Sequence, residues 1–257
     1  MTIIEQLIAL RTLFLREIYR FSRIWVQTIV PPIIMVALYF IIFGKLIGSQ
    51  IGDVKGFSYI VYIVPGMIMM SIITNSYANT VSSFYSCKFQ RHIEEMLVSP
   101  MPTYIIIWGF VSGGVARGGL IGLAVSLTAT LFTEIHVYHV WLLLLVTLLT
   151  SILFSLAGLV NAVYANSFDD ISLIPTFVLT PLTYLGGIFY SIDMLPPFWR
   201  ELSMLNPILY MVDAFRLGML GVSDIDPLLS LSVISAFVIV LYAVVHLLIS
   251  RGVGVRS

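Results

Sequence analysis

Charged residues are scarce in this sequence of 257 residues. Asp, Glu, Lys and Arg together make up 10% of it, against about 25% in ordinary soluble domains. Apolar residues make up 59%, and the mean hydropathy is +1.03. So few charges cannot cover the surface of a water-soluble fold, whereas a lipid bilayer requires no polar covering. The composition therefore predicts a membrane protein.

Other absences narrow the range of functions. The single cysteine, Cys87, excludes an intramolecular disulfide and a metal site built from cysteines. The 13 basic and 13 acidic residues balance, so no surface for nucleic acid is indicated. A phosphate loop, G-x-x-x-x-G-K-[ST], is also missing, because Tyr39 stands where the motif that would end in Gly44-Lys45 requires glycine. The chain is therefore expected to hold no metal or cofactor and to take its energy from a partner or from a gradient.

Long apolar segments are present, and each has the length of about 20 residues that a helix needs to cross a bilayer. They cover Ile24–Ile47, Phe57–Asn79, Tyr104–Phe132, Val140–Ala165, Ile171–Tyr190 and Leu228–Ser250. We interpret the first as a retained span, because no cleavage site of small residues follows it. The pattern predicts an all-α polytopic membrane protein with six transmembrane helices over residues 24–257. We expect a break in the second segment at Pro65-Gly66 and a kink in the fifth at Pro175 and Pro181.

An even number of spans puts both termini on one side of the membrane. Segments on that side hold Arg11, Arg16, Arg20, Arg23, Lys88, Arg91, Arg251 and Arg256. Segments on the other side hold Lys45, Lys55, Arg200 and Arg216. Basic residues in short loops favour the cytoplasm, so this asymmetry predicts that both termini are cytoplasmic.

Residues 1–23 precede the first span and have a helical apolar pattern. The apolar positions are Ile3, Leu7, Leu10, Phe14, Ile18 and Phe21, with arginines on the other faces. This pattern predicts an amphipathic helix on the cytoplasmic membrane surface. The alternative is an irregular lead-in to the first span.

Two further segments fit no simple span. The loop at about 88–100 has a polar start and apolar residues at Ile93, Met96 and Leu97, which predicts a short amphipathic helix that presents a surface to a partner. The outer segment at about 191–221 is divided by Pro196-Pro197 and Asn206-Pro207. Asn206 is a suitable N-cap for a helix whose first residue is Pro207. This outer segment is predicted to be a re-entrant helical pair that lines a pathway.

Specific residues in these two segments carry a family resemblance. In the outer segment they are Leu195-Pro196, Arg200, Leu205-Asn206-Pro207, Tyr210, Asp213, Arg216 and Gly221. Together they resemble the C-terminal signature of bacterial type-2 ATP-binding-cassette permeases. The run from Glu94 to Pro100 is similar to the coupling-helix motif of the same family. Members often carry Gly-Thr ahead of the coupling glutamate, where this sequence has Arg91-His92, so the coupling contact is expected to differ in detail.

The resemblance implies a permease subunit of the bacterial inner membrane. Such a subunit works as a homodimer with a separate ATPase, which binds the ATP and Mg²⁺, and it is expected to export its substrate. The residues expected to transmit the ATPase stroke are Glu94, Glu95, Met96 and Leu97. The residues expected to shape the outer gate are Asn206, Pro207, Tyr210, Asp213 and Arg216. Members serve polysaccharides, lipid-linked glycans, drugs and other hydrophobic compounds, so no single substrate is implied.

The third apolar segment contains two further features. Arg117 is an intramembrane charge, which marks either a contact in the pathway or a structural arginine with a buried partner. A stripe of small residues follows four-residue spacing along the same segment and comprises Gly114, Gly118, Gly122, Ser126 and Thr130. Such a stripe lets helices approach closely, and packing within one subunit is favoured over a dimer contact.

Two other classes of protein fit the sequence less well. A gradient-driven secondary transporter normally shows repeated halves and carboxylates within its spans, which this sequence lacks. An intramembrane hydrolase needs a nucleophile and a base at matching depth. Ser112 lies one residue too far from Gly109 for a G-x-S-G motif, and His246 lies near the end of the last span. The permease interpretation is therefore preferred to both.

Overall fold

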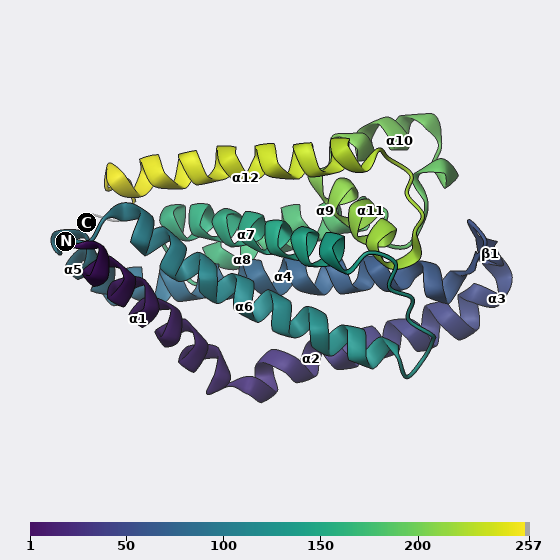
Figure 1. Ribbon diagram of the computed structural model, residues 1–257, viewed down its shortest axis with the longest axis horizontal. Coiled ribbons are helices and arrows are strands. Elements are labelled where there is room, and N and C mark those ends of the chain that lie inside the picture. The colour runs from purple at the N-terminus through teal and green to yellow at the C-terminus, as the bar shows by residue number, and fades with distance from the viewer. Residues whose placement is uncertain (255–257) are drawn as a thin grey trace.

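A computed structural model of the protein describes residues 1–254, and its long helices run side by side along the longest axis (Figure 1). The long helices are α2 (Trp25–Tyr39), α4 (Tyr59–Phe89), α6 (Thr103–Ala129), α7 (Val140–Tyr164) and α12 (Pro227–Ser250). Helix α4 is the centre of the bundle, because it packs against both α6 and α7 along its length. Helix α12 covers the outer side of α7.

Shorter elements complete the chain. The remaining α-helices are α1 (Ile3–Ser22), α3 (Gly48–Ile51), α5 (His92–Val98), α8 (Asp170–Ile174), α9 (Thr180–Tyr184), α10 (Pro197–Met204) and α11 (Pro207–Leu220). Two π-helical stretches, η1 (Phe40–Ile47) and η2 (Pro175–Leu179), and a 3₁₀ turn, η3 (Ile192–Met194), link them. The strands β1 (Asp53–Val54) and β2 (Phe57–Ser58) form a small antiparallel hairpin in which Asp53 pairs with Ser58.

The prediction of an all-α polytopic membrane protein is confirmed. Within residues 1–254, five helices are long and apolar enough to cross a bilayer, and the first of them runs from Trp25 through the π-helical turns to Gly44. The predicted fifth segment is the exception, because it is divided into α8, η2 and α9 rather than forming one regular helix. Pro175 and Pro181 lack the N–H that a regular α-helix would use, which accounts for the change to π-type hydrogen bonding.

The expected break at Pro65-Gly66 is wrong, because α4 continues through both residues. One missing hydrogen bond does not end a helix of 31 residues that is held by two neighbours. Gly66 serves close packing instead, since a Cβ at this position would lie 2.6 Å from the carbonyl oxygen of Ile188. Helix α4 also runs ten residues beyond the predicted end at Asn79, to Phe89.

Both termini lie at the same end of the bundle, together with α5 (Figure 1). The β hairpin, α3 and α10 lie at the opposite end. These positions agree with an even number of crossings. Arg256, one of the basic residues counted for orientation, lies outside the described residues.

Helix α1 contacts the bundle through one narrow face. Leu13 and Glu17 are buried, and they lie against Gly109 and Gly113 of α6, where a Cβ would meet them. The apolar side chains of its first turns, such as Leu7 with 61% of its surface exposed, are free of the bundle. Helix α1 is thus amphipathic, as predicted, and its exposed apolar positions are suited to contact lipid.

The outer segment contains the predicted pair of helices, α10 and α11. The N–H of Ile208 donates to the Asn206 side-chain oxygen at 3.0 Å, and Pro207 is the first helical residue, so the predicted cap is confirmed. Gly221 ends α11 in the left-handed region, with φ of 73°. Helix α11 is mostly buried and packs against α4, α7 and α12.

Candidate functional site

A groove of about 470 Å³ lies between α2, α4 and α9, at the level of the middle of α4. Polar side chains in its wall are Gln27, Thr28, Ser71, Thr74, Asn75 and Thr180. The other lining residues are three methionines, two prolines, one valine and two tyrosines. Because five of the helices are apolar enough to lie in lipid, a groove at this level with polar side chains in a mainly apolar wall is a candidate transport pathway.

The two helical segments that flank the groove are irregular. Helix α2 contains Pro31 and Pro32, which both line the groove, and the segment opposite changes to π-helix at Pro175. Irregular backbone at membrane depth is tolerated where it is buried in protein or lines a cavity. The positions of these prolines therefore support the groove as the site at which the chain contacts a substrate.

An aromatic cluster borders the outer part of the groove. The hydroxyls of Tyr39 and Tyr184 lie 3.3 Å apart across it. Phe189 stacks on Phe43 with ring centroids 5.1 Å apart and on Tyr184 at 6.0 Å. These rings connect the first apolar segment to the end of the fifth.

The predicted gate residues hold the segment that carries these rings. The Asn206 amide donates to the carbonyl oxygen of Leu182 at 2.6 Å, and Arg216 donates to that of Gly187 at 2.6 Å. The first acceptor lies within α9, and the second lies between α9 and Phe189. Tyr210 donates to the Met204 carbonyl at 2.8 Å and so ties α11 to α10. The structure thus places these residues behind the aromatic cluster rather than in the groove.

Asp213 and Arg216 lie one turn apart on α11 and are almost fully buried. Their nearest charged atoms are 3.9 Å apart, so they form an ion pair without a direct hydrogen bond. Asp213 instead accepts hydrogen bonds from the loop after α11, from the N–H groups of Asp224 at 2.8 Å and Ile225 at 3.1 Å. The Arg216 guanidinium lies 4.2 Å from the ring centre of Tyr62 on α4. The pair therefore fastens α11 to α4 and to its own following loop.

A second ionic contact ties the hairpin to this region. Lys55, between β1 and β2, pairs with Asp224 and lies 3.5 Å from Asp193. Asp193 also pairs with Arg200 of α10 at 3.3 Å. The outer end is thus a network of charges that joins segments far apart in the sequence.

Arg117 lies on α6, half-buried, and donates to the side-chain oxygen of Asn75 at 3.3 Å. Among residues 1–254 it forms no ion pair with a carboxylate. Asn75 itself lines the groove. Arg117 therefore contacts the groove indirectly, through the Asn75 amide. It has a buried polar partner, as a structural arginine does, and it also lies next to the candidate pathway.

The glycine stripe packs inside the subunit, as favoured from the sequence. A Cβ at Gly114 would overlap the side chains of Ser155 and Thr80, and one at Gly118 would overlap that of Ser76. A Cβ at Gly122 would lie 2.8 Å from Ile72. The three glycines therefore allow α6 to lie directly against α4 and α7.

Helix α5 is the predicted coupling helix, and its bounds fall inside the predicted 88–100. It follows α4 after two residues, the second of which, Arg91, has a φ of 61°. Ile93 is fully buried, and Met96 and Leu97 are half-buried against the core, so these apolar side chains anchor α5 instead of forming the exposed surface expected from the sequence. Glu95 and Val98 face outward, with Val98 88% exposed, and Glu94 is half-buried.

The short connection after α7 is held by Asp170. Its carboxylate accepts the backbone N–H of Asn166 at 2.8 Å and that of Ser167 at 3.1 Å. This aspartate therefore shapes the entry to α8.

Sequence reasoning missed the groove residues on α2 and α4. Ser71 and Asn75 are four residues apart and so share one face of α4, where the Asn75 amide donates to the Ser71 carbonyl at 3.0 Å. That spacing within an apolar run, together with Pro31-Pro32, was the available signal. The same reasoning missed Glu17, a fully buried carboxylate on α1, for which the spacing to Arg20 was the signal.

The chain is similar in sequence to known proteins over most of its length. The family model for the ABC-2 type transporter matches residues 8–220. The chain is 57% identical over 251 residues to the inner membrane transport permease YadH of Escherichia coli (strain K12), which covers 97% of this chain and 98% of that protein. It is also 27% identical over 219 residues to nodulation protein J of Rhizobium leguminosarum bv. viciae, with 83% of each chain covered.

Proposed function

Because the chain belongs to the ABC-2 type transporter family as a permease, we propose that it forms the membrane-spanning part of an ATP-driven transporter in the bacterial inner membrane. Two copies would enclose the translocation pathway, and a separate ATPase would drive it. The family likeness favours export as the direction of transport.

The observation that carries this proposal is the groove between α2, α4 and α9, whose mainly apolar wall contains several polar side chains. Its wall offers amide and hydroxyl groups such as those of Gln27 and Ser71, and an aromatic cluster borders its outer part. A single chain supplies only part of the wall of such a pathway. Two grooves facing each other would enclose a polar channel, which is why we propose a homodimer with α2 and α9 toward the partner.

Energy would come from the partner ATPase, which would bind the ATP and Mg²⁺. This chain lacks the phosphate loop needed to hold ATP. Helix α5 would receive the ATPase stroke through Glu94 and Glu95, while the inward-facing Met96 and Leu97 would pass it to the bundle. Only two residues separate α5 from α4, so a displacement of α5 is transmitted directly to the helix that lines the groove.

We propose six crossings, with α8, η2 and α9 together as the irregular fifth and α10 with α11 as a re-entrant pair. Both termini and α5 lie at one end of the bundle, which supports this count (Figure 1). The distribution of basic residues supports a cytoplasmic location for that end.

The test is ATP hydrolysis in lipid vesicles by the purified chain, alone and with the ATPase encoded beside it. We expect no hydrolysis by the chain alone and an altered rate for the ATPase in its presence. The double variant Glu94→Ala, Glu95→Ala should return that rate to the rate of the ATPase alone. Glu134→Ala is the matched control, because Glu134 is an exposed acid in the loop between α6 and α7, at the end opposite α5.

A failure of the ATPase to bind would contradict the proposal. Gradient-driven transport would then become the function to test, with substrate uptake measured against an imposed proton or sodium gradient. Loss of the effect in Glu134→Ala as well would show a general charge effect and would contradict the role of α5.

A further inference from the structure

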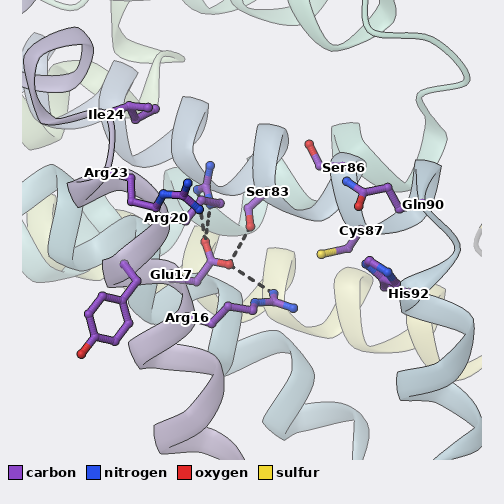
Figure 2. A pocket seen from close by; sticks show the side chains of 11 residues that line it. Arg16, Glu17, Arg20, Arg23, Ile24, Ser83, Ser86, Cys87, Gln90 and His92 are labelled. Atoms are coloured by element: carbon purple, nitrogen blue, oxygen red, sulfur yellow. Dashed lines mark hydrogen bonds and ion pairs between the residues drawn. The ribbon is translucent and has the colours of Figure 1, made fainter.

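A second, larger pocket of about 740 Å³ lies between α1, the last turns of α4 and the start of α5 (Figure 2). It is separate from the groove, since α1 and the α4 residues from Ser83 onward form its wall. Three arginines of the α1 segment line it: Arg16, Arg20 and Arg23. The single acid in its wall is Glu17, so the pocket has an excess of positive charge.

Glu17 holds two of these arginines in place, as Figure 2 shows. It is fully buried, and its two oxygens receive Arg16 at 3.2 Å and Arg20 at 3.1 Å. The Ser83 hydroxyl donates to it at 2.6 Å. Arg20 also donates to the side-chain oxygen of Asn79 at 2.7 Å. A carboxylate engaged in this way fixes the guanidinium groups but does not neutralise all three.

Donors remain unused in this pocket. The Arg23 side chain forms no hydrogen bond or ion pair with any residue in the described range 1–254, and neither do the side chains of Gln90 and His92. Arg16 has one ion pair and lies 5.0 Å from the ring centre of Phe110, which leaves further N–H groups free. Grouped arginine N–H groups bind phosphate oxygens in a fork geometry.

The rim of the pocket is apolar. Tyr19 and Ile24 line it with 67% and 42% of their surfaces exposed, and Trp25 follows with 58% exposed. The wall from α4 consists of the last turns of a helix long enough to cross the bilayer, which is the level at which lipid headgroups lie. A ligand for this site therefore has an anionic head and an apolar tail.

From these observations we propose that the pocket binds the phosphate-bearing headgroup of an acidic membrane phospholipid. The arginines bind the phosphate, and the acyl chains lie along Tyr19, Ile24 and Trp25. The inference is independent of the ATPase partner and of the transported substrate. A bound headgroup also touches Gln90 and His92, where α4 passes into α5.

Cys87 provides a direct reporter, since it lines the pocket and is the only cysteine in the chain. The experiment measures the rate at which N-ethylmaleimide, an uncharged reagent, modifies Cys87 of the full chain in phosphatidylcholine vesicles. Phosphatidylglycerol is then introduced at increasing fractions. We expect the rate to fall as the acidic lipid fills the pocket.

Arg23→Gln should raise the phosphatidylglycerol fraction needed for half-protection about fivefold, which corresponds to about 1 kcal/mol for one basic residue at an acidic membrane surface. Arg11→Gln is the matched control, because it removes the same charge from α1, of which Arg23 is the C-cap residue, at a position outside the pocket. It should leave half-protection unchanged. Both arginines are exposed, so both variants should fold.

Three results would overturn the proposal. Absence of protection would exclude the site. An equal shift in Arg11→Gln and Arg23→Gln would show attraction to the surface as a whole. Protection by inorganic phosphate at millimolar concentration in phosphatidylcholine vesicles, equal to that by phosphatidylglycerol, would show that the pocket takes a soluble anion rather than a lipid. Protection by the lipid alone, weakened only in Arg23→Gln, supports the proposal.

Discussion

At the scale of single residues, the outer network depends on two buried charges with different partners. Asp213 receives the N–H groups of the loop after α11, while Arg216 holds the Gly187 carbonyl and contacts the Tyr62 ring. They lie 3.9 Å apart in a region with little exposure to solvent. Removal of either leaves the other charge buried with less compensation.

We expect Asp213→Ala and Arg216→Ala each to destabilise the protein by about 3–5 kcal/mol, and the double variant by less than the sum. Thermal unfolding of the purified chain in detergent measures the three values. Glu201→Ala, an exposed acid on α10, is the control and should change unfolding little. Additive effects of the two substitutions would show that Asp213 and Arg216 act independently and would contradict the pairing.

Sequence spacing predicted the Asn206 cap, and the three-residue spacing of Asp213 and Arg216 is enough to place them on one helical face, because both features lie within one helical turn. It did not predict that Asn206 and Arg216 bind the carbonyls of Leu182 and Gly187, which lie 24 and 29 residues away. Glu17 was missed although its spacing to Arg20 is visible in the sequence, because that spacing does not show that Glu17 is buried. Its contact with Ser83 joins residues 66 positions apart, and local periodicity contains no information on such contacts.

At the scale of helices, the three glycines of α6 set the distance to α4 and α7. The neighbouring Gly119 has no atom within 4 Å of the position that a Cβ would take. The two adjacent glycines Gly118 and Gly119 therefore differ in packing while sharing one helix and one intrinsic propensity.

We expect Gly118→Ala to destabilise the protein by about 1–3 kcal/mol, because the added methyl overlaps the side chain of Ser76. Gly119→Ala should be neutral or stabilise by up to about 1 kcal/mol through helix propensity. Unfolding temperatures of both variants in the same detergent provide the comparison. Equal changes in the two would contradict close packing along the stripe.

Hydropathy predicted the helices that are apolar throughout. The predicted bounds of α7 and α12 agree with the observed bounds to within one residue at each end. It ended α4 too early because Ser76, Asn79, Thr80 and Ser83 are polar. All four are buried inside the bundle, where neighbouring helices rather than lipid surround them. The kink expected in the fifth segment is present as the change to π-helix from Pro175, although hydropathy alone does not show that the segment divides into α8, η2 and α9.

At the scale of the whole molecule, α2 and α12 both expose most of their surfaces but differ in what they border. The exposed residues of α12 are mostly apolar, as expected for a face toward lipid. Helix α2 borders the polar groove and connects to α9 through Tyr39 and Tyr184. The face that carries α2 is therefore the one that we expect a second copy to cover.

A cysteine in place of Leu38 on α2 should form a cross-link between two copies in native membranes, in a background with Cys87→Ser. Leu38 is 52% exposed. The control is Ile239→Cys on α12, at a residue that is 68% exposed and equally apolar. It should give no cross-linked dimer on gel electrophoresis. A dimer in Ile239→Cys but not in Leu38→Cys would place the contact on the other face of the bundle.

The shared location of the two termini has a consequence for gene organisation. The first residues and the last described ones lie beside α5, so a soluble domain encoded in frame at either end would be delivered to the same face of the bundle (Figure 1). No added crossing or long linker would be needed. A fusion of permease and ATPase into one polypeptide is thus compatible with this architecture in either order. The geometry of the bundle does not require that the two be encoded separately.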